Sequence, residues 1–344
     1  NLDANAMRNH FYRFPGVDND KDKTLSAMLR MAVIAQTQER YEKAPVETDE
    51  QRAEKAALEG LVKQLFVELK RDFKPSDLPP YTLVKLGMHL AGTSQPEESI
   101  AYFDEILDPS EPDPVRKKAR INGMSKYRKN AVFGKAVALG RSKDNAKVDT
   151  AIKMMRDELS KEESSSNPDR KAMEDAQYNL VKFTFARQDW PAVIAAADKY
   201  RENKTYKKNL PEVLYLQGEA YLKQNELDKA LINFMNITGT YKGLVKWSAP
   251  AVLAQMDTLW KRNTMSQGAG KQPSDRYVAW KAGSQYVQLL DTPANRKKMT
   301  AGDSALVNEV KDKTAKFGSD PAVSQERADI AAYEAAVRAA KGQK

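Results

Sequence analysis

The sequence contains no cysteine and only two histidines, His10 and His89. A chain without cysteine cannot form disulfides, zinc fingers, iron–sulfur clusters or thiol nucleophiles. Without a histidine pair we expect no transition-metal site, and nothing marks the partnered histidine that a Ser-His-Asp triad needs. His89 lies in an apolar segment, so we expect it to pack rather than to bind a ligand. The sequence therefore predicts no metal site, no cofactor and no catalytic residue.

Long apolar runs and nucleotide-binding loops are missing as well. No apolar run reaches the roughly 18 residues of a membrane-spanning helix, so we expect no such helix. The GAGK segment at 268–271 resembles a phosphate loop, but no strand is predicted before it and its spacing is wrong. The DNDKD segment at 18–22 begins like a calcium loop but lacks the glycine and the closing glutamate. We interpret the first as a flexible connector and the second as a polar turn.

The formal net charge of +9 favours acidic partners. One stretch carries eight cations with no acid between them: Arg116, Lys117, Lys118, Arg120, Lys126, Arg128, Lys129 and Lys135. Such a stretch can neutralise a nucleic acid or another anionic polymer. Acids are interspersed with bases over the whole chain, so a solvated surface is the favoured interpretation and nucleic acid is not the expected partner.

Apolar residues recur at helical spacing, and the alternating runs of Val, Ile and Thr that are typical of strands are missing. An all-α fold is therefore predicted. Thr48 and Gln51 form a capping box that is expected to open the second long helix. Helices are expected near residues 23–44, 51–72, 80–92, 97–107, 114–140, 147–163, 169–187, 190–202, 211–224, 227–241, 247–262, 273–291, 300–316 and 321–340.

The expected organisation has four parts. These are an irregular arm at 1–21, a long helix hairpin at 22–75, helical repeats at 76–243, and further hairpins with a capping helix at 244–344. Because the chain lacks cysteine and starts at Asn1 rather than Met, we expect an exported bacterial protein, periplasmic or otherwise extracytoplasmic. A lipid anchor is compatible with this expectation, and a cytoplasmic location stays open.

The segment LYLQGEAYLKQNELDKALINFMNITGTY at 214–241 carries the clearest internal pattern. Gly218, Tyr221, Ala230 and Phe234 follow one another at spacings of three, nine and four. This pattern resembles the tetratricopeptide repeat (TPR) family, from which the chain departs at the usual tryptophan and proline positions. The small residues let two helix backbones approach, and the rings fill the space beside them.

Weaker copies of the pattern lie upstream. They comprise Gly87, Ser99 and Phe103; Gly134, Ala151 and Met155; and Val181, Val193 and Ala197. The resemblance implies a right-handed αα-solenoid of antiparallel helix hairpins, in which the first helix of each repeat lines a concave face.

The same resemblance implies a set of partner-binding residues on that face. They are Tyr178, Lys182, Phe185, Tyr215, Glu219, Leu222, Lys223, Arg128 and Lys135. This mixture of aromatic, aliphatic and basic side chains suits an extended protein or peptide ligand, including an acidic one.

Three functions remain open at this point. The first is a non-catalytic TPR scaffold of the bacterial cell envelope that binds a protein or peptide. The second is a binder of nucleic acid or anionic polymer through the basic stretch at 116–135. The third is an enzyme that uses carboxylates only, which would need paired acids with raised pKa values. The repeat pattern and the missing catalytic groups favour the first.

Overall fold

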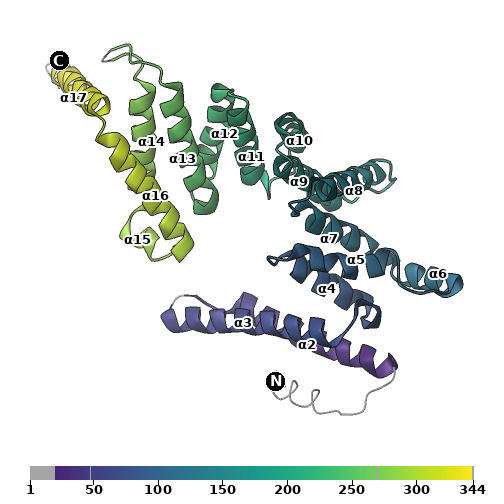
Figure 1. The fold of residues 1–344 in the computed structure, drawn as a ribbon. Coiled ribbons are helices and arrows are strands. Elements are labelled where there is room, and N and C mark those ends of the chain that lie inside the picture. Colours follow the sequence, from purple (N-terminus) through teal and green to yellow (C-terminus); the bar gives the residue numbers. More distant parts are fainter. Residues whose placement is uncertain (1–19, 47, 269, 343–344) are drawn as a thin grey trace. The chain divides into compact units, whose positions relative to one another are not determined.

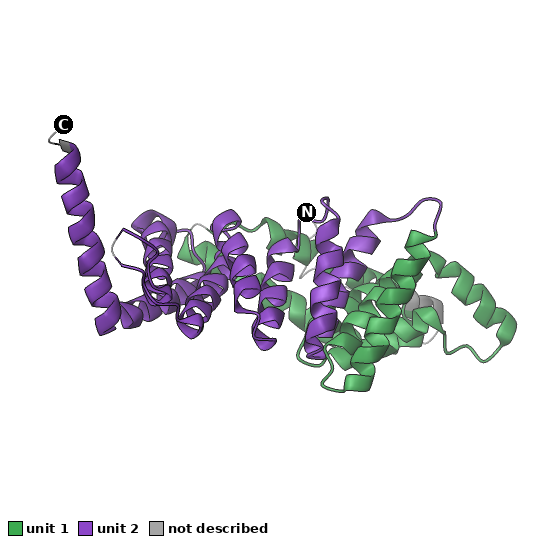
Figure 2. Ribbon diagram, turned by 90° about the horizontal axis from the view of Figure 1, so that it is seen from above, with its two compact units in different colours: residues 1–164 green, residues 165–344 purple. Residues whose placement is uncertain are grey.

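The computed structural model describes residues 20–46, 48–268 and 270–342 (Figure 1). Within these residues the chain forms sixteen α-helices, three short 3-10 helices and no strand. The predicted all-α fold is therefore confirmed. Two compact units divide the chain at residues 164 and 165, and Figure 2 shows them in green and purple.

The first unit begins with a hairpin of two long helices, α2 (Asp20–Lys43) and α3 (Asp49–Asp72). The Thr48 hydroxyl accepts from the Gln51 N–H at 3.2 Å, and the Gln51 side chain accepts from the Thr48 N–H at 3.1 Å. The predicted capping box is thus confirmed. Asp20 and Lys21 are already helical, and residues 1–19 of the expected arm, which include His10, lie outside the described residues.

Shorter elements complete the first unit. They are η1 (Pro75–Asp77), α4 (Pro80–Ala91), η2 (Pro96–Ser99), α5 (Ile100–Leu107), α6 (Pro114–Gly123), η3 (Ser125–Tyr127), α7 (Arg128–Gly140) and α8 (Asn145–Glu163). One buried apolar cluster, which includes Ile34, Phe66, Leu83 and Phe103, joins α2, α3, α4, α5 and α7.

Residues 114–140 do not form the single helix that the sequence predicts. The helix α6 ends at Gly123, and α7 begins only at Arg128. Glycine inside a helix is less favourable than alanine by about 1 kcal/mol. The break after Gly123 also lets Met124 join the buried cluster, whereas α6 itself buries no residue. Burial of Met124 therefore accompanies the interruption.

Phe103 lies against two glycines from different helices. A Cβ on Gly87 would lie 2.8 Å from the Phe103 ring, and one on Gly134 would lie 2.2 Å from it. Both glycines allow a helix backbone to approach the ring more closely than any other residue permits. Ser99, which occupies the small-residue position of this copy, is fully buried, as the repeat pattern predicts.

The second unit consists of helices that pack mainly on their neighbours in sequence. They are α9 (Arg170–Ala186), α10 (Trp190–Glu202), α11 (Leu210–Lys223), α12 (Leu227–Thr240), α13 (Val245–Arg262), α14 (Asp275–Leu290), α15 (Pro293–Arg296), α16 (Ala301–Gly318) and α17 (Pro321–Gly342). In addition, α9 contacts α11, α11 contacts α13, and α13 contacts α16. This arrangement is consistent with a helical repeat.

The contact between α11 and α12 repeats the contact around Phe103. A Cβ on Gly218 would lie 2.6 Å from the ring of Phe234, which is fully buried. In the α9–α10 pair the larger residue lies on the first helix and the smaller residue on the second. Val181 occupies the glycine position, Ala197 occupies the phenylalanine position, and both are fully buried. Val181 and Ala197 belong to one buried apolar cluster.

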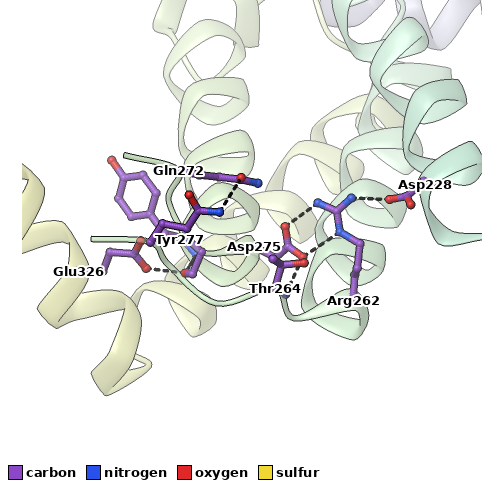
Figure 3. Close-up of polar contacts among 9 residues, drawn as sticks. Asp228, Arg262, Thr264, Gln272, Asp275, Tyr277 and Glu326 are labelled. Atoms are coloured by element: carbon purple, nitrogen blue, oxygen red, sulfur yellow. Dashed lines mark hydrogen bonds and ion pairs between the residues drawn. The ribbon is translucent and has the colours of Figure 1, made fainter. Parts of the chain in front are cut away.

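The connection between α13 and α14 is tied to three helices (Figure 3). Arg262 donates to both carboxylate oxygens of Asp275, at 2.8 and 2.6 Å, and to Asp228 at 2.5 Å. Asp275 also accepts from the Thr264 N–H at 2.8 Å. Burial opposes the ionised form of Asp275, but the hydrogen bonds from Arg262 and Thr264 outweigh it and lower the pKa. The predicted connector is therefore anchored at its two ends.

Candidate functional site

Seven of the predicted partner-binding residues lie on two neighbouring helices of the second unit, α9 and α11. The helix α13 also contacts α11 and adds Trp247 to the same region. We name this region the aromatic face. It consists of Tyr178, Lys182, Tyr215, Glu219, Lys223 and Trp247.

Tyr178 connects α9 to α11. Its hydroxyl donates to Glu212 at 2.6 Å, and the Lys182 ammonium lies 5.2 Å from the centre of its ring. Burial raises the pKa of Tyr178, and the hydrogen bond to Glu212 raises it further. The ring is partly exposed. It is therefore a fixed aromatic surface that a ligand can contact at small entropic cost.

Tyr215 forms the centre of the aromatic face. The centre of its ring lies 5.8 Å from that of Phe234 and 6.4 Å from that of Trp247. Burial raises the pKa of Tyr215 to about 12, with a contribution from the charge of Glu219. Burial likewise raises the pKa of Glu219, while Lys223 opposes that shift. The result is a half-buried patch of aromatic rings beside a carboxylate, which can both stack and accept hydrogen bonds.

Phe185 and Leu222 take part mainly in packing. The Phe185 ring lies edge-on to Trp190 of α10, with 5.6 Å between the ring centres. Leu222 packs on the apolar cluster that contains Phe234. Lys182 and Lys223, in contrast, are exposed. Of the seven residues, the tyrosines, Glu219 and the two lysines are thus best placed to meet a ligand.

The two remaining predicted residues, Arg128 and Lys135, lie on α7 in the first unit. The Lys135 ammonium pairs with Asp104 of α5 at 2.6 Å, so the fold already neutralises its charge. Arg128 is exposed and forms no ion pair within the described part of the chain. The structure therefore assigns these two cations to a different unit from the aromatic face.

Half of the cations in the basic stretch at 116–135 have acidic partners from outside the stretch. The pairs are Lys117 with Asp108 at 2.6 Å, Arg120 with Glu105 at 3.0 Å, Lys129 with Glu162 at 2.6 Å, and Lys135 with Asp104 at 2.6 Å. Arg116, Lys118, Lys126 and Arg128 form no ion pair among residues 20–46, 48–268 and 270–342. The charge available to a polyanion is thus smaller than the sequence alone indicates.

The buried carboxylates have structural partners. Glu105 is 3% exposed, accepts from the Ser110 hydroxyl at 2.7 Å and pairs with Arg120. Asp275, also 3% exposed, binds Arg262 and Thr264 as described above. Such contacts hold the local structure around each carboxylate.

His89 packs as the sequence predicts. Its ring stacks on Phe66 with 4.0 Å between the ring centres, and burial lowers its pKa. Among the described residues, no group of three His, Asp or Glu side chains is arranged to hold a metal ion. The same residues contain no helix that is long and apolar enough to cross a membrane.

Sequence reasoning missed a cleft of about 510 Å³ in the second unit. The cleft lies between residues 243–247, at the start of α13, and the segment 290–303, and its lining includes Leu244, Trp247 and Met299. These residues come from separate segments, so no local pattern reveals them. The one available signal was the tryptophan at the start of α13, since Trp is common in binding sites.

Comparison with known proteins identifies no relative. No family model matches the chain, and no curated protein and no solved structure is significantly similar to it. Function must therefore be argued from the geometry of the described residues.

Proposed function

We propose that the chain is a TPR-type scaffold whose aromatic face binds an extended segment of a protein or peptide. The observation that carries this proposal is the pair of partly exposed tyrosines, Tyr178 and Tyr215, on adjacent first helices. The repeated Gly–Phe contact and the sequential packing support a right-handed solenoid of helix hairpins. In this proposal the protein performs no chemistry of its own.

The side chains of the aromatic face favour a particular kind of ligand. The two rings are held by neighbouring groups, so a ligand that stacks on them immobilises little additional side chain. Lys182 and Lys223 flank the rings and favour ligand residues with negative charge. The carboxyl group of Glu219 provides an acceptor for a peptide N–H. An extended peptide with apolar residues and a few acidic residues can contact the rings, the two lysines and Glu219 together.

The proposal can be tested with peptides selected by phage display on the full chain. Isothermal titration of the tightest peptide against Lys182→Ala/Lys223→Ala should show a loss of at least about tenfold in affinity. Tyr215→Ala should give a similar loss, with circular dichroism to verify the fold. Lys199→Ala/Lys261→Ala, in which two exposed lysines outside the face are replaced, is the matched control. Selected peptides that bind all variants equally would rule out the aromatic face.

The anionic-polymer function remains a second candidate, because Arg116, Lys118, Lys126 and Arg128 form no ion pair with any residue that the structure describes. Their number limits the strength of such binding, and its dependence on salt provides the test given below.

We also propose that the protein acts outside the bacterial cytoplasm, in the cell envelope. The lack of cysteine supports this location, since it avoids accidental oxidation there. Fractionation of the source cells, with protease accessibility as the readout, should recover the protein outside the cytoplasm. Recovery from the cytosol alone would reject this location.

A further inference from the structure

The cleft between residues 243–247, at the start of α13, and the segment 290–303 combines an apolar floor with positive charge. Apolar side chains contributed by the start of α13, the end of α14 and the connection to α16 line it. They are Leu244, Val245, Trp247, Leu290 and Met299. A volume of about 510 Å³ lies within the range of roughly 300–1,000 Å³ that is usual for small-molecule sites.

The apolar floor of the cleft differs from ordinary exposed surface. Leu244 is 52% exposed although it lies beside the partly buried Trp247 and Met299. Apolar side chains that converge on one concave site gain free energy when a ligand removes them from water. The cleft therefore favours a ligand with an apolar body.

The charge at the rim comes from Lys246 and Lys298. Both line the cleft, both are exposed, and neither forms an ion pair within the described part of the chain. The Lys246 ammonium lies 5.1 Å from the centre of the Trp247 ring, at the edge of the floor. Two cations without carboxylate partners beside an apolar floor favour a ligand with an anionic end.

The other polar groups of the cleft are occupied. Asp303 accepts from the Thr300 N–H at 3.2 Å and from its hydroxyl at 2.8 Å, as part of the cap of α16. The Asn295 side chain donates to the Leu289 carbonyl at 2.9 Å. Asp303 keeps its negative charge, but the two lysines outnumber it, so the lining of the cleft is positive on balance. The start of α13 adds to the positive character, since Leu244 provides no side-chain cap there.

We propose that this cleft binds a small apolar carboxylate. The apolar body packs on Leu244, Trp247 and Met299, and the carboxylate lies between Lys246 and Lys298. The cleft shares Trp247 with the aromatic face, but Leu244, Met299, Lys246 and Lys298 lie outside that face, so the two sites can be tested by different variants. A short fatty acid and an apolar amino acid with a blocked amine share this chemistry, and the experiment distinguishes them.

The test uses the indole N–H signals of the full chain in proton–nitrogen NMR spectra. The chain has four tryptophans, so Trp247→Phe assigns the Trp247 signal directly. Hexanoate and N-acetyl-leucine are titrated in parallel with their neutral amides, hexanamide and N-acetyl-leucinamide. We expect at least one carboxylate to shift the Trp247 signal with a Kd of about 1–10 mM, as its few atoms allow. The matching amide should bind at least about tenfold more weakly.

Charge variants decide whether the lysines recognise the carboxylate. Lys246→Gln/Lys298→Gln should reduce the affinity for the acid to that for its amide. Lys261→Gln/Lys297→Gln removes the same charge from exposed lysines outside the cleft and should leave the affinity unchanged. Leu244→Ala should weaken the acid and the amide alike, because it removes part of the floor without adding a side-chain cap to α13.

The relative affinities for hexanoate and N-acetyl-leucine indicate which kind of molecule the cleft binds. Tighter binding of hexanoate indicates an acyl chain, and tighter binding of N-acetyl-leucine indicates an amino acid or a peptide end. The proposal is overturned if acid and amide bind equally to the unmodified chain, or if carboxylate binding survives in Lys246→Gln/Lys298→Gln. It is also overturned if neither carboxylate shifts the Trp247 signal at about 50 mM, well above the expected Kd.

Discussion

The ring of Phe234 fills the space that a side chain on Gly218 would need, since a Cβ there would lie 2.6 Å from the ring. Gly218→Ala should therefore force the ring or the helix α11 to shift. We expect the free energy of unfolding to fall by about 1–3 kcal/mol, as is usual for overpacked sites. Urea unfolding followed by circular dichroism measures the change.

Gly239→Ala in α12 is the matched control for this substitution, because a Cβ there meets nothing within 4 Å. We expect it to leave stability unchanged or to raise it by up to about 1 kcal/mol. Phe234→Leu should make Gly218→Ala less destabilising than it is alone, since the two sites are coupled. Equal effects of Gly218→Ala and Gly239→Ala would show that the close packing is wrong.

Arg262→Met should destabilise the second unit, because it leaves the buried carboxylate of Asp275 without its bidentate partner. Since Arg262 is itself 31% exposed, water can replace part of the lost contact, and we expect a loss of about 2–3 kcal/mol. Asp228→Asn removes only the outer contact of Arg262, from a carboxylate that is 79% exposed, and should change stability by less than about 1 kcal/mol. Urea midpoints at pH 7 compare the two variants.

The same ion pair predicts a dependence on pH. The folded state lowers the pKa of Asp275, so the contribution of the pair is present above the unfolded pKa of about 4. It is lost as the pH falls through the lower pKa of the folded state. The difference between the unmodified chain and Arg262→Met should therefore shrink on acidification below about pH 4. A difference that stays constant down to about pH 2, about two units below the unfolded pKa, would argue against the ionised pair.

The side chain of Tyr215 should ionise at a pH well above that at which a free tyrosine ionises. Burial raises its pKa from 10.0 to about 12, so the protonated form is favoured in the folded state. Its contribution to stability is complete below about pH 10 and is lost as the pH rises towards 12. Carbon-13 labelling of the tyrosine ring allows the titration to be followed, with Tyr215→Phe to assign the signal. Glu219→Gln removes a neighbouring charge and should move the midpoint downward, whereas a midpoint at 10 in the unmodified chain would contradict the buried environment.

Binding to a polyanion, if it occurs, should depend weakly on salt. The four cations of the basic stretch without internal partners imply a slope of log K against log salt no steeper than about −4 for duplex DNA. Arg116→Gln/Lys118→Gln should reduce the slope by about 2. Lys117→Gln should have little effect, because Lys117 is paired with Asp108. A slope near −7 is expected if all eight cations contact the polyanion. Such a slope would show that the internal ion pairs open on binding.

Local signals predicted most of the helices. Pro114, Pro211 and Pro321 mark helix starts, and the Thr48–Gln51 capping box marks another. These signals act within a few residues, so they can be recognised without the tertiary structure. The break at Gly123 was missed because it also depends on the burial of Met124 among residues that are distant in sequence.

The candidate sites were less accessible to prediction than the helices. Tyr178 and Tyr215 could be predicted as candidates because the repeat pattern places them on first helices. The acidic partners of Lys117 and Lys135 were not found, since they come from α5 and the residue that follows it rather than from the stretch itself. The lysines of the cleft, Lys246 and Lys298, are 52 residues apart and have no common motif. Such groupings exist only after the helices have packed.

The exchange of large and small residues between hairpins restricts how this chain can be recombined. If α11 were transplanted alone beside α10, Gly218 would face Ala197 and a void would remain. If α9 were transplanted beside α12, Val181 would collide with the ring of Phe234. A chimera must therefore carry both helices of a hairpin together, which makes the pair, and not the single helix, the smallest module that can be shuffled.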